Sequence, residues 1–136
     1  CNNIEDNTQV AHRSGRPVMF DQCLESLDHI TKTVADGVAH SVCLKPAFLG
    51  GVEVARAARD ICIAAGLPMR VDGPWCGHIA TAVCLHLAVG VPPELLIAGC
   101  DLRQPLLLND DWGGTQHLPH HRIAPTILPG HGAAPV

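Results

Sequence analysis

The feature that most constrains this chain is a series of short apolar segments, each of which ends in a charged residue. These segments are residues 16–21, 40–45, 67–72 and 95–101. Between them lie segments with the apolar periodicity of amphipathic helices, at residues 24–37, 51–66 and 78–90. The unit recurs about every 25–30 residues, which is typical of a strand followed by a helix. The sequence therefore predicts alternating β-strands and α-helices.

Capping residues support the predicted helix boundaries. Gly37 and Gly66 stand where the first two of these helices should stop. A further helix is expected over residues 1–15, with Asn2 or Asn3 as its N-cap. Two faces are expected to be buried, Val52, Ala55, Ala58, Cys62 and Ala65 on one helix, and Ile79, Val83, Leu87 and Val91 on another.

The strands are almost continuously apolar, which predicts a parallel sheet covered on both faces. Proteins of this class place their chemistry at the carboxyl ends of the strands. A single charge there is explained by contact with solvent, but four successive charged ends favour a site. Those four residues are Asp21, Lys45, Asp72 and Asp101. The lysine is then expected to point into a pocket at the mouth of a barrel.

Charge, hydrophobicity and cysteine content argue against several classes of protein. The 136 residues are 47% hydrophobic with a net charge of −4 and show no basic stripe, so nucleic acid is not an expected partner. No apolar run approaches the roughly 18–20 residues of a membrane span. Seven cysteines occur, mostly in apolar runs and never as Cys-x-x-Cys. We expect reduced core thiols and a cytoplasmic protein, with a zinc site around Cys76, His78, Cys84 and His86 as the less favoured alternative.

Lys45 suggests acid–base chemistry. A lysine can act as a base only when it is neutral part of the time, which burial and a nearby cation both favour. Asp21, one strand earlier, could bind a divalent cation such as Mg²⁺ through hard carboxylate oxygens. A lysine base beside a bound Mg²⁺ is suited to removing the proton next to a substrate carboxylate.

Several segments carry a family resemblance: RPVMFDQCLES, VCLKPAFLGGVEVARAARDICIAAGLPM, VDGPWCGHIATAVCLHLA and RIAPTILPGHG. They resemble the C-terminal part of the mandelate racemase and muconate lactonizing branch of the enolase superfamily. The DGPWCGHIATA segment is most similar to the cis-3-hydroxy-L-proline dehydratase group and its proline-derivative epimerase relatives. The resemblance covers essentially the whole chain and implies the C-terminal half of a (β/α)8 barrel.

The resemblance also implies residue roles. Asp21 matches the metal-binding acid that ends the fifth barrel strand, and Lys45 matches the acid/base lysine of the sixth. Trp75 matches an aromatic residue that lines the substrate pocket after the seventh strand, which ends in Asp72. Asp101 matches an acid at the end of the eighth strand, near the substrate.

The sequence departs from the family pattern at several points. The chain does not begin with Met, and the metal-binding acids of the third and fourth strands and the lysine pair of the second strand are missing. Gln22, His78 and His131 replace residues that are usual in the family. We therefore expect a truncated protein that is inactive alone, with a partial barrel over residues 1–103 and a loop-rich tail over 104–136 that would return toward a missing capping domain.

Three functions remain open at this stage. The first is Mg²⁺-assisted α-proton abstraction from a small carboxylate, leading to dehydration of a hydroxyproline. The second uses the same first step for racemisation or epimerisation of a proline derivative or another amino or sugar acid. The third is a non-catalytic half-barrel that associates with another chain. The resemblance also implies that the full-length form is a homo-oligomer.

The remaining histidines have plainer interpretations. His86 lies among apolar helix residues and is expected to be a core histidine with its hydrogen bonds satisfied. His117, His120 and His121 are expected in a solvated loop, with metal binding as the alternative. Trp112, followed by two glycines, could belong to a loop that closes over a ligand or to a surface turn.

Overall fold

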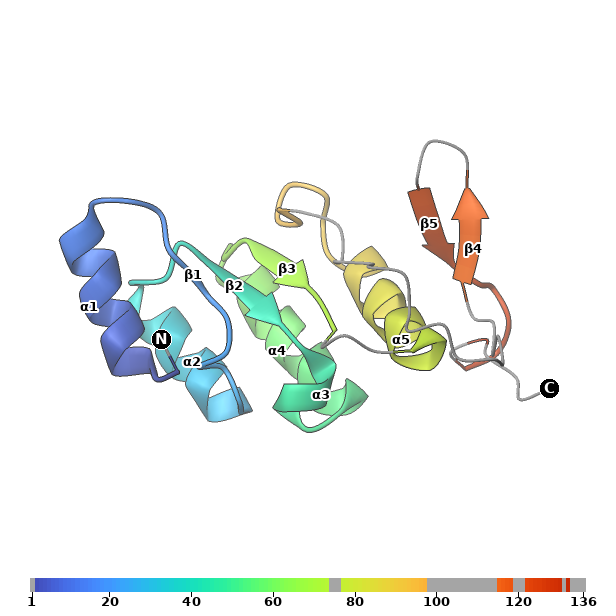
Figure 1. The fold of residues 1–136 in the computed structure, drawn as a ribbon, viewed down its shortest axis with the longest axis horizontal. Coiled ribbons are helices and arrows are strands. Elements are labelled where there is room, and N and C mark those ends of the chain that lie inside the picture. Colours follow the sequence, from blue (N-terminus) through green and yellow to red (C-terminus); the bar gives the residue numbers. More distant parts are fainter. Residues whose placement is uncertain (1, 74–76, 98–114, 119–121, 131, 133–136) are drawn as a thin grey trace.

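The structure is a computed structural model that describes residues 2–73, 77–97, 115–118, 122–130 and 132. Its helices are α1 (Ile4–Ser14), α2 (Leu27–Asp36), α3 (Pro46–Leu49), α4 (Val52–Ala64) and α5 (His78–Val89). Its strands are β1 (Met19–Phe20), β2 (Ser41–Leu44), β3 (Met69–Val71), β4 (Thr115–Leu118) and β5 (Arg122–Pro125). The alternation of strands and helices predicted for residues 1–90 is confirmed, and α3 is an additional helical turn (Figure 1).

The predicted N-cap of α1 and the predicted end of α2 at Gly37 both form, and α2 has an N-cap that was not predicted. The side chain of Asn3 accepts a hydrogen bond from Asp6 N at 2.7 Å, which satisfies one of the free amides at the start of α1. Ser26 caps α2 in the same way by accepting from His29 N at 3.2 Å. Gly37 ends α2 with a φ of 62°, a left-handed conformation that disfavours residues with a β-carbon.

The sheet is parallel, with the strands in the order β1-β2-β3. Phe20 aligns with Val42, and Leu44 aligns with Val71. The predicted fourth strand is represented, within the described residues, by a single parallel bridge between Leu96 and Met69. Because the order follows the chain, each helix returns the chain to the next position in the sheet, as in half of a (β/α)8 barrel.

One face of this sheet forms the hydrophobic core with the helices. Alternate residues of a strand point to opposite faces, and aligned residues on neighbouring strands share a face. The core-facing strand residues are Phe20, Val42, Leu44, Met69 and Val71, each at most 1% exposed. Ala55, Ala58 and Cys62 of α4 pack there with no exposed surface.

The prediction that helices cover both faces is wrong within the described part of the chain. Apart from Met19, the residues that alternate with the core positions are small, polar or charged, which does not suit an apolar helix layer on this second face. Its members on the three strands and at their ends are Met19, Asp21, Ser41, Cys43, Lys45, Arg70 and Asp72. In a barrel, this is the face that lines the interior.

Two of the predicted helix faces are only partly correct. On α4, Ala55, Ala58 and Cys62 are buried, but Val52 is 52% exposed. Ala65, beyond the end of this helix, is also exposed. On α5, Leu87 is buried, whereas Ile79 is 39% exposed. Cys84 and Ala88 of α5 join Leu87 and Val91 in the core cluster, and Ala82 is also fully buried.

The C-terminal tail contains a β-hairpin. The prediction of loops is wrong for residues 115–118 and 122–125, where β4 and β5 pair antiparallel. The hairpin lies beside α5, at the end of the molecule away from α1 (Figure 1). The tail has no βα periodicity, and two four-residue strands are too short for the apolar pattern to reveal.

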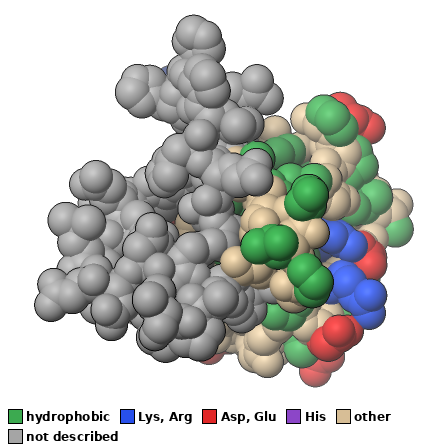
Figure 2. Space-filling model, turned by 90° about the vertical axis from the view of Figure 1, so that its right-hand side faces the viewer, with side chains coloured by type: hydrophobic (Ala, Val, Ile, Leu, Met, Phe, Trp, Pro, Cys, Tyr) green, Lys and Arg blue, Asp and Glu red, His purple; other side chains and the backbone are tan. Residues whose placement is uncertain are grey.

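The surface has mixed charge where it is visible. Figure 2 views the molecule from the side of the hairpin, and its described atoms show basic side chains next to acidic ones, with hydrophobic side chains between them. Within the described residues, no helix combines the length and apolarity needed to cross a membrane.

Candidate active site

Lys45 and Asp21 meet at the carboxyl ends of two neighbouring parallel strands. Lys45 Nζ lies 2.7 Å from Asp21 Oδ1, and the two side chains are 10% and 31% exposed. Both residues lie on the second face of the sheet, one directly after β1 and the other directly after β2. The structure therefore brings these two predicted residues together, and their roles in a site remain a prediction.

Asp21 has an oxygen suited to a metal ion. The contact to Lys45 is an ion pair without hydrogen-bond geometry, so Oδ1, which is buried, has no hydrogen-bond partner among the described residues. A carboxylate oxygen is a hard ligand of the kind that Mg²⁺ prefers, and here Oδ1 already faces a cation, the Lys45 ammonium. No group of three potential ligands from His, Cys, Asp or Glu occurs in the described part of the chain. Asp21 therefore fits the role of one ligand in a set completed from elsewhere.

The turn after β2 holds Lys45 in place. Pro46 starts the short helix α3, which carries Phe48 back over the lysine, with Nζ 5.5 Å from the ring centroid. Gly50 and Gly51 follow with φ values of 96° and 120°, which residues with a β-carbon rarely adopt. The Lys-Pro-x-x-x-Gly-Gly pattern thus forms a sharp turn, at the start of which the Lys45 ammonium contacts Asp21. Phe48 was not predicted as a contact, although its position one helical turn after Lys45 was a usable signal.

Gln22 is a second contact that the sequence alone did not reveal. With its amide nitrogen facing the carboxylate, it donates to Asp21 Oδ2, and its oxygen accepts from Lys45 Nζ at 3.2 Å. Gln22 is exposed at the start of the turn after β1. Sequence reasoning noted only that this residue replaces an acid.

Cys43 lies on the same face as this pair. It is 4% exposed, and burial raises the pKa of its thiol to about 12. The Asp21 and Asp72 carboxylates raise this pKa further, and the Lys45 ammonium opposes them. The thiol is therefore neutral at physiological pH and buried, but it lies on the second face rather than in the hydrophobic core where it was expected.

Asp72 ends β3 next to Lys45 in the sheet register and is 8% exposed. Its Oδ2 lies 2.9 Å from Arg70 Nη2, and its Oδ1 accepts a hydrogen bond from Gly73 N at 2.9 Å. Arg70 lies on the same face, aligned with Cys43. These contacts show Asp72 as a fixed anion at the edge of the site; its expected contact with substrate remains a prediction.

Other candidates are only partly described. Trp75 and Asp101 lie outside the described residues, as do Trp112, His120, His121 and His131. His117 belongs to β4 rather than to a loop. His86 was expected to have its hydrogen bonds satisfied, but its buried Nε2 has no hydrogen-bond partner among the described residues.

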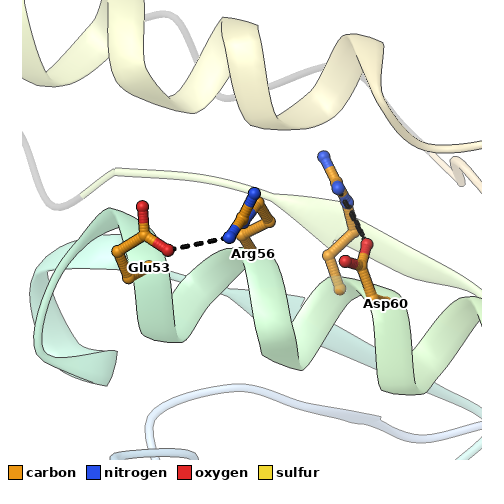
Figure 3. Close-up of polar contacts among 4 residues, drawn as sticks. Glu53, Arg56 and Asp60 are labelled. Carbon is orange, nitrogen blue, oxygen red and sulfur yellow. Dashed lines mark hydrogen bonds and ion pairs between the residues drawn. The ribbon is translucent and has the colours of Figure 1, made fainter.

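His86 also lines a cavity of about 340 Å³ away from the strand ends. Val52, Arg56 and Arg59 of α4 form one wall, and Val83, His86 and Leu87 of α5 form another. Figure 3 shows that Arg56 on α4 is paired with Glu53, at 2.9 Å, and a second pair joins Arg59 to Asp60 at 2.7 Å. Because these arginines already have carboxylate partners and the walls are otherwise apolar, the cavity lacks a reactive pair like that of Lys45 and Asp21.

Comparison with known proteins gives consistent matches. The family described as enolase C-terminal domain-like matches residues 1–135. A cis-3-hydroxy-L-proline dehydratase of Roseibium aggregatum is 27% identical over 136 residues, which are 100% of this chain and 37% of that protein. An N-succinylamino acid racemase of an Amycolatopsis species is 29% identical over 143 residues, 96% of this chain and 35% of that protein.

Solved structures agree with the fold. A mandelate racemase/muconate lactonizing enzyme from Roseovarius nubinhibens has a TM-score of 0.88 and 32% identity, over 99% of this chain and 36% of that one. An enolase superfamily member from the same organism, complexed with magnesium, has a TM-score of 0.85 and 27% identity, over 100% of this chain and 37% of that one. The chain thus spans about a third of the length of the relatives it matches.

Proposed function

The chain belongs to the enolase C-terminal domain-like family, and from this premise we propose that it contributes the base to α-proton abstraction from a small carboxylate substrate. The observation that carries the proposal is the 2.7 Å pair of Lys45 and Asp21 at the ends of adjacent parallel strands. The family's characterised relatives named above are a dehydratase and a racemase. Both kinds of reaction can begin with loss of an α-proton.

Lys45 has the properties that this first step requires. Its side chain is 10% exposed, so little water competes for Nζ. The turn formed by Pro46, Gly50 and Gly51 restricts where Nζ can reach. In the neutral form, Nζ accepts the α-proton and then holds it as an ammonium beside the Asp21 carboxylate, which stabilises the positive charge.

Asp21 is the chain's contribution to a magnesium site. Its Oδ1 is the oxygen without a hydrogen-bond partner among the described residues. Bound Mg²⁺ supplies positive charge beside the substrate carboxylate, which favours the negative charge that forms there as the proton leaves. We propose that the remaining ligands come from protein outside the described residues, and that the chain alone does not turn over substrate.

The fate of the proton distinguishes the candidate reactions. The Roseibium relative favours dehydration of a hydroxyproline, in which the proton stays on Lys45 while hydroxide leaves with a proton from another acid. The Amycolatopsis relative favours a racemase, in which a proton returns to the carbon. We place dehydration first and racemisation or epimerisation second. A half-barrel without catalysis that pairs with another chain is the third candidate.

The test is α-proton exchange in D₂O followed by NMR, with cis-3-hydroxy-L-proline and Mg²⁺. One sample holds the chain alone, and the other holds the chain joined to the preceding part of the barrel from the Roseibium relative. We expect exchange or dehydration in the joined protein only. Lys45→Ala should lower its rate about 10²- to 10⁴-fold, because the general base is lost.

Lys32 provides the matched control, since it is the other lysine of the chain and lies on the surface of α2 with a side chain that is 52% exposed. Lys32→Ala should leave the rate unchanged. If Lys45→Ala retained the exchange rate of the parent, Lys45 would not be the base. Exchange without loss of water would favour the racemase or epimerase over the dehydratase.

A further inference from the structure

The feature that no role yet accounts for is the amide of Gln22, which bridges the two charged groups of the site. In the amide orientation that satisfies both neighbours, its nitrogen donates to Asp21 Oδ2 and its oxygen accepts from Lys45 Nζ at 3.2 Å. One neutral side chain thus contacts both members of the pair. It offers a donor to the carboxylate and an acceptor to the ammonium.

The backbone holds Gln22 in this position. Leu24 N donates to Asp21 O at 3.0 Å, which closes a turn around residues 21–24. Cys23 and Leu24 are each 2% exposed and belong to the hydrophobic core, so the turn is fixed to the body of the protein. Gln22 itself points out of the core and is free to reach the charged pair.

The neutral amide has a specific electrostatic consequence. Asp21 and Lys45 together carry no net charge, and Gln22 leaves this balance unchanged. A glutamate in its place would offer Lys45 a second carboxylate and would have no proton to donate to Asp21 Oδ2. The amide engages Oδ2, so Oδ1 is the carboxylate oxygen that faces a cation, which is Lys45 in this structure.

We propose that Gln22 is a positioning residue, which orients the Asp21 carboxylate and the Lys45 ammonium through one bridging amide. Its importance for catalysis rests on the proposed function, but the bridge itself does not. Gln22 contacts no substrate in this assignment; it acts through the two groups that it holds.

The bridge can be tested on the chain itself by NMR with ¹⁵N-labelled lysine. Only Lys32 and Lys45 are present, so two side-chain signals are expected. Gln22→Leu removes both hydrogen bonds while keeping a similar size. It should accelerate exchange of the Lys45 ammonium protons with water about fivefold, the factor expected for loss of one net hydrogen bond. The Lys32 signal serves as an internal reference.

Gln9→Leu is the matched control, because Gln9 is an exposed glutamine on α1 and no hydrogen bond to its side chain is seen among the described contacts. It should leave the Lys45 signal unchanged, and the backbone amide spectrum should show that both variants remain folded. A folded Gln22→Leu variant with Lys45 exchange at the parent rate would overturn the bridge.

Kinetics of the joined protein test the consequence for catalysis. Gln22→Leu should lower kcat about 10- to 100-fold and change KM less than about twofold, because orientation rather than binding is lost. Gln22→Glu keeps an acceptor for Lys45 but removes the donor to Asp21, so Lys45 should stay protected while kcat falls. Equal kcat in Gln22→Leu and the parent would overturn the positioning role, whereas failure of the proposed function would appear separately, as activity retained by Lys45→Ala.

Discussion

The two faces of the same three strands differ in the kind of side chain that they bury and in their charge. On the core face, five strand residues are at most 1% exposed and belong to one hydrophobic cluster with residues of the helices. On the second face, Asp21, Cys43, Lys45 and Asp72 place charges and a thiol within electrostatic range of one another. Burying polar groups lowers the stability of a fold. The second face can hold such groups because burial of apolar side chains on the core face stabilises the protein.

The largest expected effect is on the core face. Leu44→Ala should lower the free energy of unfolding by about 2–5 kcal/mol, since Leu44 is fully buried between β1, β3 and the helices and its loss leaves a cavity. Urea unfolding measures the change. Met19→Ala on the second face, where Met19 is 40% exposed, is the control and should cost less than about 1 kcal/mol. Equal costs would remove the distinction between the faces.

A smaller effect is expected from the charged pair. Asp21→Asn leaves Lys45 with a mostly buried charge and no carboxylate at 2.7 Å, so we expect a loss of about 1–3 kcal/mol in the free energy of unfolding. Glu25→Gln, at an exposed acid of the same loop, should change it by less than about 0.5 kcal/mol. The double variant Asp21→Asn/Lys45→Met should lose less than the sum of its two single variants. Strict additivity would show that the pair is not coupled.

The third expected effect is absent at neutral pH and appears only in alkaline solution. The thiol of Cys43 has a folded-state pKa of about 12, against an ordinary value of 9.0. Between these values the unfolded state binds fewer protons than the folded state, so this residue makes stability fall as pH rises from about 9 toward 12. The loss is at most about 1.4 kcal/mol per pH unit.

Cys43→Ala should therefore flatten the alkaline part of a curve of unfolding free energy against pH. Cys62 on α4 has the same sign of shift, because burial raises the pKa of its thiol to about 11, and Cys62→Ala is the comparison from the core face. Cys43 should affect the slope to a higher pH than Cys62, because the carboxylates around it add to the effect of burial. An unchanged slope in Cys43→Ala would contradict the placement of its thiol among those charges.

Much of the site could be predicted from the sequence. Lys45 follows an apolar strand and precedes Pro46 and two glycines, and Asp21 follows the strand before it, so the meeting of the two at one edge was predictable from the parallel order. Gln22 and Phe48 were not predicted as contacts. Their role depends on the turn angles after β1 and β2, which a pattern of apolar residues does not specify.

The sequence by itself determined the order of strands and helices, the N-cap of α1, the end of α2 and the placement of charge at strand ends, because these depend on local periodicity and on residues such as Asn3 and Gly37. Only the tertiary structure decided which face of the sheet the helices cover and which side chains contact Lys45. Both depend on strand register and on packing between residues far apart in the chain. Local sequence preferences specify neither of these.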